Sequence, residues 1–335
     1  MSRNQSSKWF VVIIVGLSIL MCGFSAWAKE GDQLRKFEIG GGSVGGIYYI
    51  SANAFADLFN KKLGMNIPFT ASATKGSGEN IAMLDIDRME GATVSANGLY
   101  TAWNGLRPYK KKYRNMRIVT KVFPNPAVFF ALKGSGITKI RELKGKRVGC
   151  GSGPVTWEPV TRPILEAHGI DYNTGVDKVF GSFSDLCNQV RDKLIAASIG
   201  NVSAGKALMP AISALASEKA LVFLEWDPEV LESLPKELPY YKKMIVKASA
   251  LPGRETDYPT LDIGSQQFIV RDDLPEELVY KITKVIHENI SQLAASSKFF
   301  QFAADNPEFM ASKLGDIQYH PGAVRYWKEV GLWQE

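Results

Sequence analysis

Gly40-Gly41-Gly42-Ser43-Val44-Gly45-Gly46-Ile47-Tyr48-Tyr49 is the stretch that decides how this chain begins to fold. It follows the short segment Phe37-Glu38-Ile39 and precedes an amphipathic run that reaches Lys62, a pattern typical of a strand, a tight turn and a helix start. Glycines let the backbone approach a bound molecule closely, and the free N–H groups of a helix start favour an anion. The pattern predicts a turn that binds a carboxylate or a phosphate, and the alternative is a connection that binds nothing.

Several familiar chemistries are excluded by their missing motifs. Gly-Gly-Gly-Ser-Val-Gly-Gly lacks the G-x-G-x-x-G spacing of a dinucleotide site, and the sequence contains neither a G-x-S-x-G elbow nor a Walker loop. His168, His287 and His320 are far apart, and no cysteine–histidine cluster has metal-ligand spacing. We therefore expect no metal, no cofactor and no enzymatic activity.

The first 28 residues have the layout of a secretory signal peptide. Arg3 and Lys8 form a basic start, residues 9–24 are an uninterrupted apolar run, and Ala26-Trp27-Ala28 is an A-x-A cleavage site. The apolar run is also long enough to remain as a membrane anchor, and this alternative stays open. We expect cleavage and a mature protein that begins near Lys29 and works in the periplasm.

Composition excludes a nucleic-acid partner. Without Arg3 and Lys8 the formal net charge of +6 falls to +4, and the remaining basic residues are spread along the chain instead of forming a stripe. The mature chain is long enough for two domains. Cys150 and Cys187 either pair in the oxidising periplasm or remain two buried thiols, and the sequence does not distinguish these outcomes.

Strands and helices alternate along the mature chain, which predicts two α/β lobes with mostly parallel sheets. The expected strands are 37–39, 67–71, 91–94, 116–122 and 128–132, then 147–150, 178–180, 196–199, 221–224 and 267–270. The expected helices include 47–62, 158–168, 184–193, 205–217 and one that opens at 274–277, whereas 227–265 looks irregular.

Turns with unusual composition follow the expected strands. They are short of ionised groups and rich in Gly, Ser, Thr and Asn, and they lie at 41–46, 72–80, 95–97, 151–158 and 200–205. Ligands of α/β sheets sit at the carboxyl ends of the strands. A cleft built from these turns would bind a small polar anion through neutral donors, with no lysine or arginine required.

The order and spacing of motifs along nearly the whole mature chain resemble the TAXI family of solute receptors, which serve tripartite ATP-independent periplasmic (TRAP) transporters. The matching motifs are residues 39–49, 73–80, 100–105, 143–148, 164–169, 273–280 and 320–323. The resemblance implies a type II periplasmic-binding-protein fold with two α/β lobes, a central ligand cleft and two hinge strands. Lobe I would comprise 29–130 plus 270–335 and lobe II 131–269, with crossings near 128–133 and 267–271.

The resemblance also implies a function. A receptor of this family captures a small organic anion, often a dicarboxylate or an acidic amino acid, and delivers it to a TRAP membrane permease that is driven by an ion gradient. By position, Ser43, Val44, Gly45 and Tyr48 match the first cleft turn of the family, and Ser77 and Asn80 match the second. One of Tyr48 and Tyr49 is expected to face the cleft.

Two departures from the family indicate a different ligand. Family members commonly carry Gln-Ser-Asp where this chain has Ser95-Ala96-Asn97, and Gly-Ser-Gly-Thr where it has Pro154-Val155-Thr156-Trp157. Proline lacks the N–H that an anion turn donates, and Trp157 adds bulk. Ser152 and Gly153, just before, are candidate substitute donors. The expected ligand is therefore larger, less charged or ring-bearing compared with an acidic amino acid.

Asn97 and Asn201 each end an expected strand, where an amide either binds ligand or closes a turn. The complete set of candidate ligand-binding residues is Ser43, Val44, Gly45, Tyr48, Ser77, Asn80, Asn97, Ser152, Gly153, Thr156, Trp157 and Asn201.

Other functions remain possible on the same scaffold. The chain could serve an ATP-driven ABC importer, act as a surface sensor or adhesin, or be a periplasmic dehydratase-like enzyme. The enzyme would need Glu158 or a histidine in the cleft as general acid. His168 and His287 fall within expected helices and away from strand ends, which disfavours it.

Overall fold

The first strand and the first helix form on either side of the glycine-rich turn. The computed structural model describes residues 35–42, 44, 46–204 and 206–333. In it β1 (Phe37–Gly42) is followed by α1 (Ile47–Lys62). Position 41 has to be glycine, because a Cβ there would lie 2.8 Å from the Cα atom of Tyr49. The helix therefore starts directly against the end of the strand.

One mixed sheet contains β1 and has the strand order β2-β1-β3-β13-β4. Its other strands are β2 (Phe69–Ala73), β3 (Gly91–Ser95), β13 (Gln266–Arg271) and β4 (Met116–Lys121). Phe55 and Phe59, one turn apart on α1, pack on Phe268 of β13 with ring centroids 5.1 and 6.0 Å apart. Burying such aromatic side chains fixes α1 on the sheet.

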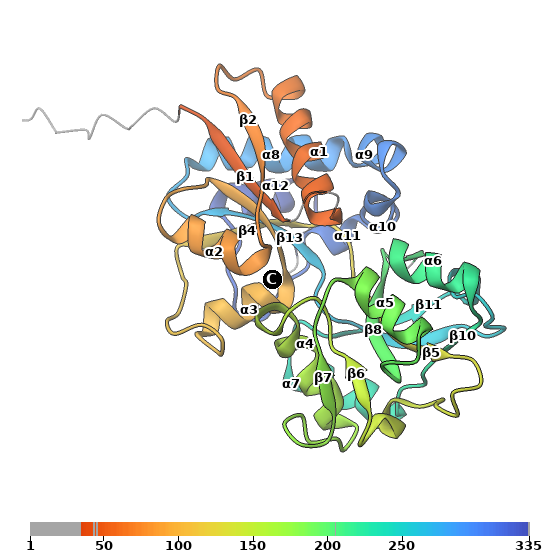
Figure 1. Ribbon diagram of the computed structural model, residues 1–335. Coiled ribbons are helices and arrows are strands. Elements are labelled where there is room, and N and C mark those ends of the chain that lie inside the picture. The colour runs from red at the N-terminus through yellow and green to blue at the C-terminus, as the bar shows by residue number, and fades with distance from the viewer. Residues whose placement is uncertain (1–34, 43, 45, 205, 334–335) are drawn as a thin grey trace, which may run out of the picture. The chain divides into compact units, whose positions relative to one another are not determined.

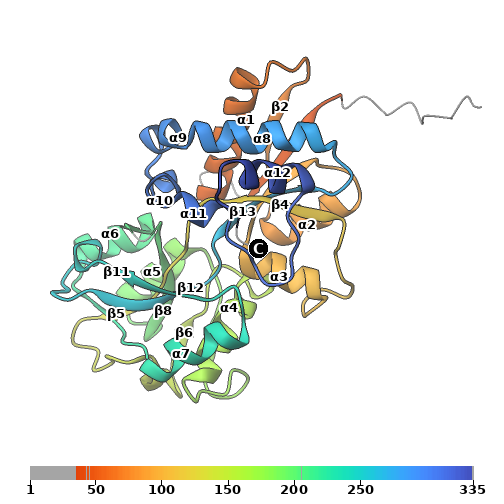
Figure 2. The same cartoon turned by 180° about the vertical axis from the view of Figure 1, so that it is seen from behind.

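The remaining helices of this part come from two regions of the chain. They are α2 (Ser77–Asp85), α3 (Ala96–Asn104), α8 (Glu276–Glu288), α9 (Ile290–Ser296), α10 (Gln301–Asp305), α11 (Pro307–Met310) and α12 (Pro321–Glu329). Figure 2 shows α8 and α12 together in front of the sheet. A Cβ at Gly322 would lie 2.2 Å from the carbonyl oxygen of Glu276, so glycine is what lets the two helices approach so closely.

A second mixed sheet has the order β10-β5-β8-β6-β7 (Figure 1). β9 pairs with β8. The strands of this sheet are β5 (Ala127–Leu132), β6 (Arg147–Gly149), β7 (Asp177–Val179), β8 (Ala197–Ser203), β9 (Ala207–Leu208) and β10 (Leu221–Phe223). Helices α4 (Pro154–Ala167), α5 (Phe183–Arg191), α6 (Pro210–Glu218) and α7 (Pro228–Glu237) accompany it. The predicted fold class, mixed α/β with several sheets, is confirmed.

The expectation of mostly parallel sheets misses the antiparallel strands β13 and β5, one in each sheet. β1 lies parallel to β2 and β3, and β6 lies parallel to β7 and β8, but β13 is antiparallel to both its neighbours and so is β5. Each of these two strands, β13 and β5, is the first one after the chain changes sheets. It enters the new sheet from the end at which the parallel strands finish, so it runs against them.

The expectation that residues 227–265 are irregular is also wrong. They contain α7 and a two-stranded antiparallel sheet of β11 (Lys242–Val246) and β12 (Tyr258–Asp262). Pro228 lies in the first turn of α7, where a missing N–H costs nothing. Pro259 lies in β12 of this small sheet, so proline does not exclude a strand in this region.

The chain changes sheets twice, through residues 122–126 and 263–265, which we call the crossing peptides. They precede the positions expected from the sequence, because β5 and β13 each lie wholly within one sheet. The two peptides run side by side: the Gln266 N–H donates to the Phe123 carbonyl at 2.8 Å and the Ile263 N–H to the Asn125 carbonyl at 3.1 Å. The limits of the two lobes remain a prediction, and the signal peptide of residues 1–28 lies outside the described residues.

Within the described part of the chain, none of the helices combines the length and apolar character needed to cross a bilayer. Cys150 and Cys187 are both buried free thiols.

Gly264→Ala should destabilise the protein by about 2–4 kcal/mol in denaturant unfolding, because two costs add. Its φ of +133° is strained for any L-residue, and a Cβ would lie 2.6 Å from Asn97 Oδ1. Gly134→Ala is the matched control, since Gly134 also has a positive φ, +88°, but nothing within 4 Å of the added Cβ. Equal losses in the two variants would contradict close packing of the second crossing peptide on α3.

Candidate functional site

A buried hydrogen-bond network centred on Asn125 joins the two sheets. Its Nδ2 donates to the Tyr48 hydroxyl at 3.1 Å and to the Gly264 carbonyl at 2.9 Å, and its Oδ1 accepts from Asn201 Nδ2 at 3.2 Å. Tyr48 comes from α1 and Asn201 from β8. The structure therefore brings together two predicted site residues through one that the sequence interpretation missed. The sequence feature that could have indicated Asn125 is Pro124-Asn125-Pro126, in which the asparagine lies between two prolines in the link between two expected strands.

Tyr48, and not Tyr49, faces this network. The Tyr48 ring meets Phe123 edge-on at 6.0 Å, whereas the Tyr49 ring packs over Gly41. Burial raises the pKa of Tyr48 well above its ordinary value, so the phenol keeps its proton. Because the oxygen accepts a hydrogen bond from Asn125, the hydroxyl hydrogen is left to donate elsewhere.

Asp262 ties the two crossing peptides together. Its Oδ1 accepts hydrogen bonds from the backbone N–H groups of Asn125 at 2.8 Å and Gly264 at 3.0 Å. Burial raises the pKa of Asp262 to about 6, and burial lowers the pKa of nearby Lys121 to about 8. Lys121 directs its ammonium group to the Lys313 carbonyl at 3.0 Å. The charges at the crossings are thus one buried carboxylate and one buried amine that partly offset each other.

A small cavity of about 10 Å³ lies where the first turns of three helices meet. Its lining residues, none of which is ionised, are Ser77, Gly78, Ser95, Asn97, Gly98, Thr101, Pro108, Tyr109, Thr156 and Pro159. We call this space the donor cavity. Ser77 opens α2, Ser95 caps α3, and Thr156 lies in the first turn of α4. Free N–H groups and the positive ends of the helix dipoles make such a place favourable for an anion.

The hydroxyl groups of the donor cavity are fixed by the backbone around them. Ser77 Oγ accepts a hydrogen bond from the Ser95 N–H at 3.0 Å and lies 3.2 Å from Ser95 Oγ, which in turn accepts from the Gly98 N–H at 3.3 Å. Burial raises the pKa of Tyr109 to about 12, so its hydroxyl also stays neutral. The cavity therefore presents hydroxyl groups without a fixed positive charge.

Asn97 connects the donor cavity to the network of Asn125. The Ala96 N–H donates to the Ser265 carbonyl at 2.9 Å, and Asn97 Oδ1 lies against Gly264 of the second crossing peptide. Gln266, which opposes Ser95 in the sheet, is fully buried with no partner for either end of its amide. Asn201 Oδ1 is likewise unpartnered. Such groups cost about 1–3 kcal/mol each when left unsatisfied, so they are candidates for a bound molecule.

Other predicted residues do not line the donor cavity. Asn80 is fully buried and its Nδ2 donates to the backbone carbonyls of Gly40 at 3.2 Å and Thr93 at 2.9 Å, so it holds β1 to β3. Val44 is 76% exposed. Ser43 and Gly45 lie outside the described residues.

The turn before α4 carries Pro154 and Trp157, the residues at which the sequence departs from an anion-binding turn. Trp157 folds back over Gly151, where a Cβ would lie 2.2 Å from the indole Cγ, and its ring meets Phe183 edge-on at 5.2 Å. Ser152 is exposed and Gly153 is half-buried. Of the predicted residues on this segment, Thr156 is the one that reaches the donor cavity.

The candidate general acids of a dehydratase-like enzyme each have a hydrogen-bond or ion-pair partner. His168 uses Nδ1 on the Ile164 carbonyl and Nε2 on the Asp227 N–H, His287 bonds Tyr326, and His320 caps α12. Glu158 pairs with Arg162 at 2.5 Å. Among the described residues no group of three or more His, Cys, Asp and Glu side chains could hold a metal ion.

Comparisons with known proteins agree with this architecture. XAC2383 from Xanthomonas citri bound to ATP is 11% identical, with 89% of this chain and 97% of that chain covered and a TM-score of 0.54. PhnD1 from Prochlorococcus marinus (MIT 9301) in complex with methylphosphonate is 10% identical, with 89% and 99% covered and a TM-score of 0.51. At these identities the likeness concerns the fold. Residues 39–331 match the NMT1-like family, and the chain belongs to that family.

Asp262→Asn should change how stability depends on pH. Because the pKa is raised, Asp262 keeps its proton between about pH 4 and 6 in the folded protein, whereas it loses that proton in the unfolded chain. The stability that Asp262 contributes is therefore fully present below about pH 4 and is lost as the pH rises to about 6. Asparagine retains an acceptor but does not titrate. In denaturant melts, the free energy of unfolding of the wild type minus that of the variant should therefore fall by about 3 kcal/mol as the pH rises across this range.

Asp257→Asn is the control for this experiment. A hydrogen bond from exposed Lys247 lowers the pKa of Asp257, so its small contribution is lost as pH falls, which is the opposite sign. Parallel stability profiles for wild type and Asp262→Asn would show that Asp262 does not keep a proton in the folded state.

Proposed function

We propose that this protein is an extracytoplasmic solute receptor that binds a small organic anion between its two sheets. The observation that carries the proposal is the donor cavity, where the first turns of α2, α3 and α4 contribute hydroxyl groups without a lysine, an arginine or a carboxylate. Each helix start adds a partial positive charge of about half an elementary charge. Two of these helices follow strands of the first sheet and α4 follows β6 of the second, so an anion bound there bridges both sheets.

Binding requires that the donor cavity widens. Its volume of about 10 Å³ is enough for about one water molecule, far below that of an organic acid. The two crossing peptides are the covalent links between the sheets, so a rotation about residues 122–126 and 263–265 would open the space. Hinge closure of two lobes on a ligand is a known mode of capture. In this proposal the two lobes meet at the crossing peptides, so that β5 belongs to lobe II and β13 to lobe I, whereas the limits expected from the sequence, 130 and 270, fall inside these strands.

The neighbours support an anion as ligand without identifying it. Methylphosphonate and ATP, which PhnD1 and XAC2383 bind in their solved structures, are both negatively charged. The motif resemblance favours a carboxylate, and the departures at Pro154 and Trp157 favour a larger or aromatic acid over an acidic amino acid. No catalytic step is part of this function.

The partner that we propose is a TRAP-type membrane permease driven by an ion gradient. The choice of a TRAP-type permease rests on the motifs that resemble those of the TAXI receptors, including residues 40–49 and His320-Pro321-Gly322-Ala323. Delivery to a permease places the receptor in the periplasm after removal of its signal peptide.

The intact mass of the protein from the periplasmic fraction tests this location. We expect a chain that begins at Lys29, because Ala26-Trp27-Ala28 is the cleavage site. A full-length chain that stays with the membrane fraction would instead show a retained anchor.

A melting screen tests the binding function. A panel of amino acids, dicarboxylates, aromatic acids and sugar acids should contain at least one compound that raises the thermal midpoint by mass action. At a concentration of 100 times Kd the expected stabilisation is about 2.7 kcal/mol, or roughly 4 °C for a mature chain of about 300 residues. The absence of any shift across the panel would contradict an organic-anion receptor.

Variants locate the binding site in the same screen. Thr156→Val removes one hydroxyl of the donor cavity from an exposed position, so it should reduce the ligand-induced shift with little effect on the unliganded midpoint. Thr256→Val is the matched control, an exposed threonine elsewhere on the chain. Cys150→Ser should also leave the shift in place. Equal shifts in Thr156→Val and Thr256→Val would exclude Thr156 from the site.

A further inference from the structure

The segment between α3 and β4, residues 106–114, concentrates positive charge at the surface of the protein. Its basic side chains, which are all exposed, are Arg107, Lys110, Lys111, Lys112 and Arg114, and it contains no aspartate or glutamate. We call residues 106–114 the basic segment. Figures 1 and 2 show the chain between α3 and β4 at the outer edge of the molecule. Cations this close together repel one another unless negative charges lie nearby.

Negative charges of the protein balance only part of this positive charge. Lys111 forms an ion pair with Asp85, and Arg114 forms one with Asp316 at 3.6 Å. The other three basic side chains have no hydrogen-bond, ion-pair or ring partner among the residues that the structure describes. The basic segment therefore keeps a net positive charge that the folded chain does not use.

The backbone holds the basic segment in a defined loop. The Leu106 N–H donates to the Thr101 carbonyl at 2.9 Å. The Tyr113 N–H donates to the Ala102 carbonyl at 3.0 Å, so both ends of the segment are bonded to α3. The rings of Tyr109 and Tyr113, on either side of the three lysines, meet edge-on with their centroids 5.4 Å apart. Leu106 is 47% exposed, so the loop presents an apolar side chain as well as its consecutive lysines.

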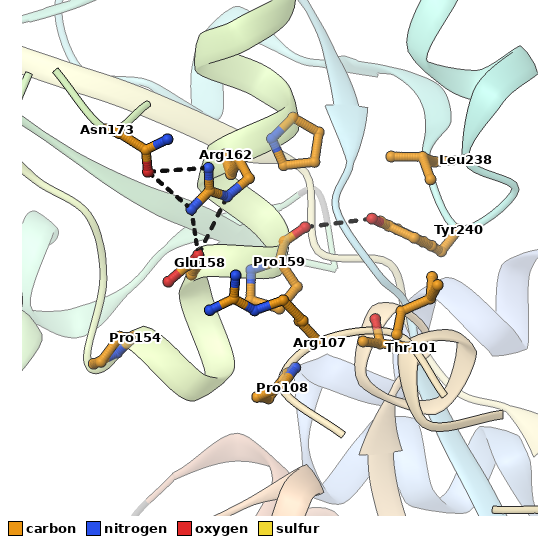
Figure 3. A pocket seen from close by; sticks show the side chains of 12 residues that line it. Thr101, Arg107, Pro108, Pro154, Glu158, Pro159, Arg162, Asn173, Leu238 and Tyr240 are labelled. Carbon is orange, nitrogen blue, oxygen red and sulfur yellow. Dashed lines mark hydrogen bonds and ion pairs between the residues drawn. The ribbon is translucent and has the colours of Figure 1, made fainter. Parts of the chain in front are cut away.

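The basic segment borders the space in which we propose that a solute binds. Pro108 and Tyr109 line the donor cavity. Leu106, Arg107 and Pro108 line a larger cavity of about 440 Å³, whose other walls come from α4 and the segment after α7. Figure 3 shows Arg107 and Pro108 among the side chains around this larger cavity. A surface that binds the basic segment therefore lies beside both cavities.

We propose that the basic segment adsorbs the protein to an anionic lipid surface, so that the two cavities lie close to the membrane. Each lysine or arginine near such a surface strengthens binding by roughly fivefold, so the three cations without a partner supply roughly a hundredfold. The exposed leucine can enter the headgroup region, as apolar side chains of interfacial segments do. This inference goes beyond the proposed function, because it does not depend on which solute is bound.

A lipid surface fits the basic segment better than a second protein does. Protein–protein interfaces are depleted of lysine, whose long side chain is flexible and whose ammonium group is strongly hydrated. Lipid headgroups form a diffuse layer of negative charge, which such side chains reach without adopting one fixed arrangement. Consecutive lysines without fixed acceptors suit this kind of contact.

Sedimentation of the mature protein with lipid vesicles tests the inference. Vesicles of phosphatidylcholine with about one-quarter phosphatidylglycerol should bind the protein, and vesicles of phosphatidylcholine alone should bind it at least about tenfold more weakly. Raising the salt from about 50 mM to about 500 mM should weaken binding to the anionic vesicles by about tenfold or more, because salt screens the attraction. Equal binding to both kinds of vesicle would contradict an electrostatic contact.

Paired substitutions locate the contact. Lys110→Gln with Lys112→Gln should weaken binding to the anionic vesicles by roughly twentyfold, since two cations are removed. Lys144→Gln with Lys146→Gln is the matched control, because these lysines are also exposed, two residues apart and without a side-chain partner among the described residues. Both variants have the same net charge, so the control measures the effect of net charge alone and should lose no more than about threefold. Equal losses in the two variants would overturn the assignment to the basic segment.

The remaining outcomes separate lipid from protein as the partner. No binding to the anionic vesicles at low salt would overturn the inference. If the protein then bound isolated native membranes, and protease treatment of those membranes abolished the binding, the basic segment would be assigned to a membrane protein instead. None of these results bears on the melting screen with small anions, so the receptor function stands or falls separately.

Discussion

The carboxylate of Asp262 is the interaction on which the arrangement of the site depends. It accepts one backbone hydrogen bond from each crossing peptide, from Asn125 in the first and from Gly264 in the second. Because these peptides are the only covalent route between the two sheets in residues 46–204 and 206–333, holding them in register also fixes where the strand ends of the sheets meet. The carboxylate itself is expensive to bury, and burial raises its pKa to about 6.

The chemistry of the site follows from that junction. Asn125 reaches Tyr48 and Asn201 from the first crossing peptide, while Gly264 of the second lies against Asn97 at the start of α3. Around them the helix starts supply N–H groups and hydroxyls, and the charged groups are kept to the margins. Donors of this kind attract an anion without fixing it as a salt bridge would, which suits a receptor that must release what it captures.

The sequence predicted features that depend on local patterns. The turn after β1 and the polar turn at Ser77 follow from glycine spacing and from the rule that α/β ligands sit at strand ends. Asn97 and Asn201 were expected to end strands, but Asn97 lies in the first turn of α3 and Asn201 lies inside β8, which continues to Ser203. The sequence did not predict Asn125, Asp262 or Gln266, because their role arises from the pairing of two peptides about 140 residues apart in the chain, as the Asn125–Gly264 hydrogen bond shows. The cavity between Leu106, Pro159 and Tyr240 was missed for the same reason, since its walls come from the segments after α3 and α7 and from α4.

A crystal structure of the mature protein with a bound monocarboxylate tests the central claim most directly. We predict that the carboxylate lies in a widened donor cavity, within hydrogen-bond distance of the hydroxyl of Ser77, Ser95 or Thr156, and makes no contact there with a lysine or an arginine. A carboxylate bound elsewhere and held by lysine or arginine side chains, with the donor cavity closed, would contradict it.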